Sequence, residues 1–316
     1  MTVLSHFAAF AAGRNSRHGL WLPPMLGIAS ACVLLALAST DFATRQNLFN
    51  LIAQAAPLLL VSIGQMIVIL VRGLDLSVGA TISLTTAILA LDAPGLYTIP
   101  GAFVAAILLG LVNGITVTVF RVHPIIATLS VTSIVQGATM LVRPVAGGTI
   151  PQVIVGLVNG DILGVPAPIL WTGVVLIVGW WLLHASRFGL HLFAIGGGDA
   201  VRSFGIASKR NTVAAYVICA LFAAVAGVFL AGRITSGDPN IGTQYAVDSI
   251  TAVALGGTQL AGGIGSLQGT VAGTFLMALV ANGMNLLNVS AFVQTAIKGL
   301  ILLAVIAVQP RKTIGL

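Results

Sequence analysis

The sequence predicts an all-α integral membrane protein with about ten transmembrane helices, some of them short or broken. Of its 316 residues 58% are apolar and only 7% are charged, whereas a soluble domain carries about 25% charged residues. The mean hydropathy is +1.08. Apolar runs also recur along the chain at lengths near the ~20 residues that cross a bilayer. We therefore expect residues 1–316 to form a single transmembrane domain.

The apolar runs lie at residues 20–40, 51–71, 76–92, 99–120, 125–142, 167–185, 211–232, 247–264, 268–287 and 291–309. Those at 76–92 and 247–264 are short and rich in glycine, so eight full spans with two broken or re-entrant segments fit as well. Arg14 and Arg17 precede the first run, which is either a cleaved signal or, as we favour, an anchor. The similarity between residues 100–114 and 268–283 suggests an inverted repeat.

The basic residues predict the orientation of the chain. If residues 1–19 are cytoplasmic, ten Lys and Arg residues fall in inside segments and three in outside segments, the asymmetry that the positive-inside rule describes. The inside residues are Arg14, Arg17, Arg72, Arg121, Arg187, Arg202, Lys209, Arg210, Arg311 and Lys312, and the outside residues are Arg45, Arg143 and Arg233. Both termini are therefore expected in the cytoplasm.

Two connections are long enough to have a function. The outside one, at 143–166, contains three prolines, Pro144, Pro151 and Pro166, with Pro168 just after it, and several glycines, which predict turns or a short surface helix. The connection at 186–210 is the longest on the inside and the most basic.

Polar residues at membrane depth are candidates for a translocation pathway. Lys298, a third of the way along the last run, is the clearest, although a lysine can also snorkel to the surface. Asn282 and Asn285 lie on one helix face and either line a passage or bond neighbouring helices; Gln294 is near them. Asp75 and Ser77, between Gly73 and Gly79, also suit a helix N-cap.

Glycine is used 37 times. Pairs such as Gly110 with Gly114 and Gly269 with Gly273 have the spacing of close helix contacts. The stretch that contains Gly256, Gly257, Gly262 and Gly263 is too flexible for a lipid-facing helix, and irregular backbone at this depth requires surrounding protein or a watery cavity. It lacks the lysine of a nucleotide-binding loop.

The sequence contains no pattern for catalysis, metal binding or nucleic-acid binding. It has no HExxH, no GxSxG and no paired carboxylates. Cys32 and Cys219 lie in apolar runs with no neighbouring cysteine or histidine cluster. The net charge of +7 comes from loop residues and not from a basic run with interleaved aromatics. We expect no cofactor in this chain.

Three stretches together resemble one family. They are Gly73-Leu-Asp-Leu-Ser-Val-Gly79, residues 195–206 from Ile195-Gly-Gly to Gly205-Ile206, and residues 245–263 from Tyr245 to Gly263; Asn282-Gly-Met-Asn-Leu-Leu-Asn288 continues the match. They are similar to the membrane permease subunits of ribose-type monosaccharide importers of the bacterial ATP-binding-cassette (ABC) class. The resemblance covers about residues 45–309.

The resemblance implies a subunit of the bacterial inner membrane that pairs with a second copy of itself or a paralogous permease. It implies a partner ATPase, which would bind ATP and Mg, and a periplasmic sugar-binding protein. The connection at 186–210 would contain the coupling helix that docks on the ATPase, through Gly197, Asp199, Ala200, Arg202, Gly205 and Ile206. Ala200-Val201, where the family tends to have two alanines, and Ala246, where an acid is usual, depart from the pattern.

The expected function is translocation of a monosaccharide or similar small polyol. The candidate pathway and loop residues are Asp75, Ser77, Asn113, Asp248, Gly256, Gly257, Gly262, Gly263, Asn282, Asn285, Gln294 and Lys298. One alternative is an ion-coupled secondary transporter with Asp75, Asp248 or Lys298 as the coupling site. The other is an ABC permease for branched-chain amino acids, whose pocket would need charged groups for a zwitterion.

Overall fold

The computed structural model describes residues 22–162, 164–198 and 205–308. Its helices are α2 (Leu22–Ala38), α3 (Arg45–Leu70), α4 (Val78–Leu89), α5 (Gly95–Thr118), α6 (Pro124–Val142), α7 (Gln152–Asn159), α8 (Ala167–Trp180), the π-helical turn η2 (Trp181–Ala185), α9 (Arg187–Gly197), α10 (Ser208–Ile234), α11 (Tyr245–Leu255), α12 (Leu267–Leu286) and α13 (Ala291–Val308). A two-stranded antiparallel sheet pairs β1 (Asp161–Ile162) with β2 (Val165–Pro166). The all-α prediction is confirmed.

Every predicted apolar run contains one helix, which in the run at 167–185 is α8 continued by η2, but the helices differ in length. Within the described residues, seven are long and apolar enough to cross a membrane, and three apolar helices are shorter, at Pro23–Ala38, Val78–Leu89 and Tyr245–Leu255. The last two are the runs predicted to be short or broken. The run at 247–264 is helical only as far as Leu255, since the glycines that follow favour irregular backbone.

Helices α3 and α10 form the centre of the bundle. Both are buried over most of their length, and they approach closely at Gly64, where a β-carbon would lie 3.2 Å from the Cα of Cys219. Lipid offers helices no hydrophobic reason to associate, so such close approach is a main source of packing energy.

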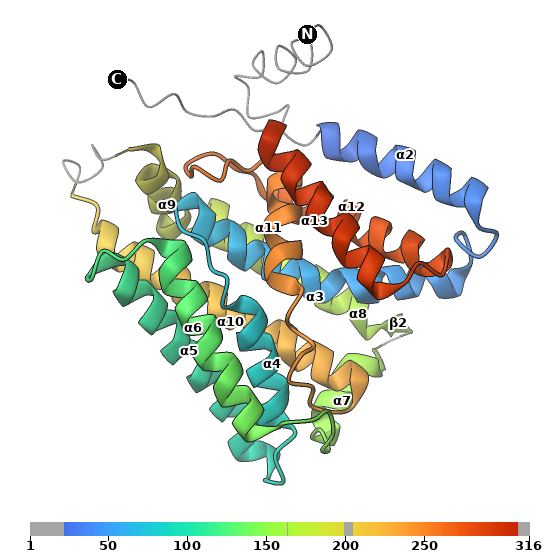
Figure 1. The fold of residues 1–316 in the computed structure, drawn as a ribbon, viewed down its shortest axis with the longest axis horizontal. Helices are drawn as coiled ribbons and strands as arrows, with labels where there is room; N and C mark the ends of the chain where they lie inside the picture. The colour runs from blue at the N-terminus through green and yellow to red at the C-terminus, as the bar shows by residue number, and fades with distance from the viewer. Residues whose placement is uncertain (1–21, 163, 199–204, 309–316) are drawn as a thin grey trace, which may run out of the picture.

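The two central helices have corresponding neighbours. Helix α10 packs on α4 and α5, and α4 packs on α5 and α6; α3 packs on α11 and α12, and α11 packs on α12 and α13. Figure 1 shows α4–α6 on one side of the bundle and α11–α13 on the other. This arrangement relates α3–α6 to α10–α13 and supports the predicted internal repeat.

The small residues lie at the closest helix contacts. A β-carbon at Gly110 would lie 2.5 Å from the Cα of Val217, and one at Gly114 would lie 2.8 Å from the Cα of Val213, both on α10. Gly269 and Gly273 lie in the same way against the backbone of α11 and the residue that follows it. The predicted role in helix packing is confirmed for both pairs.

The connection at 143–166 forms the short helix α7 and the small sheet. The helix was predicted, whereas the two strands were not. Helix α7 packs on α10: Ile154 and Val158 are buried, and a β-carbon at Gly232 would lie 2.7 Å from a methyl of Val158. Its apolar face therefore belongs to the bundle.

Candidate translocation site

Two connectors with the same local structure precede the short helices α4 and α11. They contain Asp75-Leu-Ser77-Val-Gly79 and Asp238-Pro-Asn240-Ile-Gly242. The first carboxylate accepts a hydrogen bond from the backbone N of Ser77 at 2.9 Å, and the second accepts one from the backbone N of Asn240 at 2.8 Å. Both connectors therefore contain the turn that an aspartate forms with the residue two positions later.

Asp75 is the centre of a fully buried polar cluster. Its Oδ1 accepts hydrogen bonds from Ser77 Oγ at 2.6 Å and from Asn113 Nδ2 at 3.4 Å, and Asn113 Nδ2 also donates to Ser77 Oγ at 2.8 Å. Although Ser77 occupies the N-cap position of α4, its side chain makes no capping bond, so the capping interpretation of Ser77 is wrong. The cluster joins the first connector to α5.

The amides predicted near the pathway bond neighbouring helices. Asn47 Nδ2 donates to Asn282 Oδ1 at 3.1 Å, and Asn282 Nδ2 donates back to Asn47 Oδ1 at 2.8 Å. This buried reciprocal pair joins α3 to α12. Gln294 Nε2 donates to Asn285 Oδ1 at 2.8 Å and so joins α13 to α12. Of the two uses left open for Asn282 and Asn285, helix bonding is the one that the structure shows.

Lys298 on α13 pairs with Asp248 on α11. The distance from Lys298 Nζ to Asp248 Oδ2 is 2.6 Å, and both side chains are 12% exposed. This is the one ion pair among the residues that the structure describes. Lys298 also donates to Gln244 Oε1 at 3.3 Å. A snorkelling role for Lys298 is therefore wrong, because its ammonium lies against α11.

A polar pocket of about 370 Å³ surrounds this ion pair. It lies at the end of the bundle where α3 and α11 begin and α10 ends. Its lining residues are Ala53, Gln54, Pro57, Leu58, Leu230, Arg233, Ile234, Asn240, Ile241, Thr243, Gln244, Tyr245, Asp248, Met277, Ala278, Ala281 and Lys298. Of the predicted pathway residues, only Asp248 and Lys298 line it.

Sequence reasoning did not assign Arg233, Gln244 or Tyr245 to a site. Arg233 was counted only as an outside charge, Gln244 lies outside any motif that the sequence singled out, and Tyr245 was noted only as the start of the stretch 245–263. The sequence feature that could have identified Gln244 is its spacing from Asp248: the two residues are four apart and therefore one helical turn apart.

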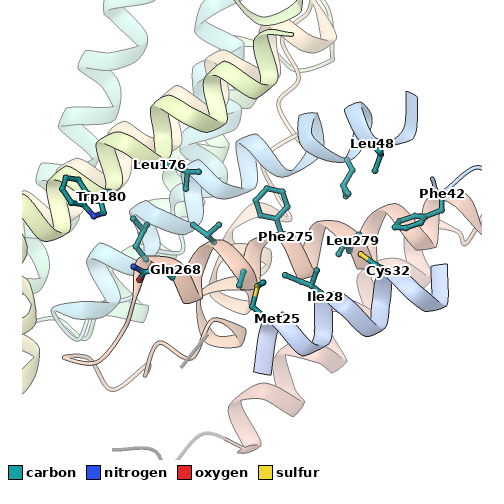
Figure 2. Close-up of a pocket in the computed structure, with 14 residues that line it drawn as sticks. Met25, Ile28, Cys32, Phe42, Leu48, Leu176, Trp180, Gln268, Phe275 and Leu279 are labelled. Atoms are coloured by element: carbon teal, nitrogen blue, oxygen red, sulfur yellow. The ribbon is translucent and has the colours of Figure 1, made fainter. Parts of the chain in front are cut away.

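A larger pocket, of about 620 Å³, lies between α2 and helices α3, α8 and α12. Figure 2 shows Met25, Ile28 and Cys32 of α2 facing Phe275 and Leu279 of α12 across it. Gln268 is its only lining residue with an amide, and none is charged. Such a lining suits lipid chains and not a hydrophilic solute.

The glycine-rich stretch after α11 lies against protein, as predicted. Gly263 N donates to Leu70 O at 3.1 Å, at the end of α3. A β-carbon at Gly263 would lie 2.5 Å from the carbonyl oxygen of Gly196 in α9, and Arg72 Nε donates to that oxygen at 3.2 Å. The ends of α3 and α9 and this stretch therefore meet at one place.

Helix α9 begins the connection predicted to dock on the ATPase. Gly197 ends the helix, and Gly205 has a φ of +74° that favours glycine; Ile206 follows it. Asp199, Ala200 and Arg202 lie outside the described residues, as do Arg14, Arg17, Arg311 and Lys312 of the orientation count.

Long apolar helices, broken segments and a polar pocket at one end of the bundle define a membrane transport protein. The family model described as "Branched-chain amino acid transport system / permease component" matches residues 47–306. The chain belongs to this permease family, in the branch that contains the ribose import permeases. It is a transport subunit and not an enzyme, and a multi-pass protein of the inner membrane.

Three relatives are named for sugars. The chain is 35% identical to the ribose import permease protein RbsC of Escherichia coli, over 95% of this chain and 98% of that protein. It is 38% identical to the L-arabinose transport system permease protein AraH of Escherichia coli, over 62% of this chain and 60% of that protein. It is 28% identical to the D-allose transport system permease protein AlsC of the same species, over 87% and 86%. No solved structure matches the chain.

Proposed function

We propose that this chain is the permease subunit of an ATP-driven importer that moves a monosaccharide or similar small polyol across the inner membrane. The observation that carries the proposal is the 35% identity to a ribose import permease over 95% of the chain. Relatives named for ribose, arabinose and allose point to aldoses of five or six carbons as the substrate class.

The orientation follows from the positive-inside rule, with both termini in the cytoplasm. In this orientation the pocket around Asp248 and Lys298 opens toward the outside, from which a periplasmic sugar-binding protein would deliver the solute. The partner on the other side would be an ABC ATPase that binds ATP and Mg. A second copy of this chain, or a paralogous permease, would complete the membrane domain.

The connection at 186–210 is our proposed docking element for the ATPase. Its helix α9 ends on Gly196 and Gly197, directly beside Gly263 and Arg72. Because α9 contacts the end of α3 and the stretch after α11 directly, a displacement of α9 would move both of them. Two rigid elements in contact transmit such a shift because packed interfaces change between discrete arrangements.

The family description leaves a branched-chain amino acid permease as a second candidate. A zwitterion needs a free carboxylate for its ammonium group. In the polar pocket the Asp248 carboxylate is already neutralised by Lys298, so the pocket offers that ammonium group no unpaired carboxylate. An ion-coupled secondary transporter would also have to keep a coupling carboxylate available, and the same ion pair argues against Asp248 in that role.

The experiment is purification of the tagged chain in mild detergent with mass spectrometry of the proteins that accompany it, followed by reconstitution of that complex in liposomes. We expect an ABC ATPase and a sugar-binding protein to co-purify. Uptake of radiolabelled D-ribose, L-arabinose or D-allose should require ATP and the binding protein. Uptake that instead needs an ion gradient, or that is specific for leucine, would contradict the proposal.

A further inference from the structure

We propose that the polar pocket around Asp248 and Lys298 is a transit site that binds one monosaccharide inside the permease, with Arg233 and Gln244 as its other hydroxyl-binding groups. The inference rests on the proposed function and adds to it a binding site in this chain. A site of this kind would let the permease itself, and not only the soluble binding protein, contribute to the choice of sugar.

The size and lining of the pocket suit a sugar. Its volume of about 370 Å³ is near the lower end of the ~300–1,000 Å³ that ligand sites occupy, as expected for a small solute. Polar groups come from α10, α11 and α13, while Leu58, Leu230 and Met277 supply an apolar wall. A sugar ring has the same division, with hydroxyls at its edge and C–H groups on its faces.

Arg233 is the strongest single indication of a ligand. Its side chain is half-buried at the end of α10, and no hydrogen bond or ion pair joins its guanidinium to any residue in the described part of the chain. A guanidinium has five N–H donors in a planar fork. Two neighbouring hydroxyls of a sugar can accept from that fork together, as a carboxylate does.

The ion pair offers both kinds of hydrogen-bonding group while carrying no net charge. Lys298 uses two N–H groups, on Asp248 Oδ2 and Gln244 Oε1, and an ammonium has three. Asp248 Oδ1 accepts no hydrogen bond from the residues that the structure describes. One donor and one acceptor thus remain for a hydroxyl, which can donate and accept at the same time.

The chemistry therefore favours a polyol over a zwitterion. A zwitterion would find no free carboxylate for its ammonium group, because Asp248 is paired with Lys298. The mouth of the pocket lies at a bundle end and not in a closed cavity, so we expect weak binding that permits release. A transported solute has to bind well enough to enter and weakly enough to leave.

The test measures sugar binding to the permease directly. The permease–ATPase complex is placed in lipid nanodiscs without the binding protein, and saturation-transfer NMR is recorded with D-ribose, L-arabinose and D-allose. We expect one or more of these sugars to bind, and Arg233→Gln to raise its Kd by about tenfold, as the loss of a hydrogen bond to a charged group does. Arg45→Gln is the matched control, because Arg45 lies exposed at the same end of the bundle and does not line the pocket.

The double variant Asp248→Asn with Lys298→Met removes both charges together and keeps the side chains similar in size. It should weaken binding of the same sugar while the complex keeps most of its thermal stability. A wild-type complex that transports a sugar but shows no saturation transfer, or an Arg233→Gln complex with an unchanged Kd, would overturn the transit site while leaving the proposed function intact. Absence of ATP-dependent uptake of all three sugars by the complete wild-type importer would instead overturn the proposed function.

Discussion

Gly79 and Gly242 lie against each other where the two connectors cross. A β-carbon on Gly79 would lie 2.5 Å from the carbonyl oxygen of Gly242, and one on Gly242 would overlap the carbonyl group of Gly79. Each glycine stands four residues after the aspartate of its own connector. The contact therefore joins equivalent positions of the two repeats, α3–α6 and α10–α13.

Substitution at this crossing is expected to be costly. Gly79→Ala or Gly242→Ala places a methyl group against backbone that cannot move aside, and overpacking of this kind costs about 1–3 kcal/mol. The measurement is the apparent Tm of the detergent-solubilised protein. Gly137→Ala in α6 is the control, because a β-carbon there meets no atom within 4 Å and alanine favours the helix by about 1 kcal/mol. Equal Tm values for all three variants would contradict the crossing.

Removing one partner of the ion pair should destabilise the protein more than removing both. Asp248→Asn or Lys298→Met leaves the other charge unpaired at membrane depth, which costs about 3 kcal/mol for a buried pair. In the double variant no charge remains to be solvated, so most of the stability should return. The wild type, the two single variants and the double variant form a double-mutant cycle, which is measured by thermal unfolding in one detergent. Additive effects of the two substitutions on stability would contradict the pairing.

Gly263→Ala is expected to leave folding and assembly intact but to disrupt the coupling between the permease and the ATPase. The φ of Gly263 is +79°, a conformation that costs an alanine roughly 1–2 kcal/mol, and its β-carbon would press on Gly196 of α9. We expect the protein to insert and assemble, but the liganded binding protein should no longer stimulate ATP hydrolysis in the reconstituted complex. Gly173→Ala in α8, where a β-carbon meets nothing within 4 Å, should behave as wild type. Normal stimulation in the Gly263→Ala complex would show that this contact does not transmit the signal.

The reciprocal bonds between Asn47 and Asn282 predict a measurable coupling. Hydrogen bonds between membrane helices average about 0.6 kcal/mol in double-mutant cycles, with values up to ~1.7 kcal/mol, and two bonds join these amides. Asn47→Leu and Asn282→Leu alone should each leave a buried amide without its partner, whereas the double variant leaves none. Unfolding free energies in mixed micelles measure the coupling, and a coupling of zero would show that these bonds contribute nothing.

The docking connection offers a test of the ATPase contact. We predict that Asp199→Ala or Arg202→Ala weakens co-purification of the ATPase while membrane insertion and the Tm of the permease stay unchanged. Arg45→Ala, exposed at the start of α3 on the expected outside of the membrane, serves as a control of equal charge change to Arg202→Ala. Full recovery of the ATPase with both variants would mean that docking lies elsewhere.

The sequence was a good guide to the helices because lipid imposes a simple length and polarity on each span. The two short helices were also predictable, since glycine clusters such as Gly256 and Gly257 interrupt their runs. The exact end of α11 at Leu255 was less accessible, because five glycines follow between residues 256 and 265 and the sequence alone does not state at which of them the helix stops.

The composition of the site was predicted less completely. Asp248 and Lys298 were both candidates, but they stand 50 residues apart, and nothing in either neighbourhood states that they form a pair. Asn282, like Lys298, was a candidate because it is a polar residue in an apolar run, yet its side chain bonds Asn47 on α3. Partner choice depends on which helix faces which, and a single sequence does not contain that information directly.

The exposed position of α13 has a consequence for biogenesis. No residue of this helix is buried within the described chain, and it is held to α11 by Lys298 and by the bond between Gln244 and Thr295. Helix α11 leaves the ribosome before α13, so the Asp248 carboxylate waits in the membrane without its cation until α13 is inserted. A nascent chain that stalls in this interval therefore keeps at membrane depth an ionisable group without its partner, and such a group is costly there.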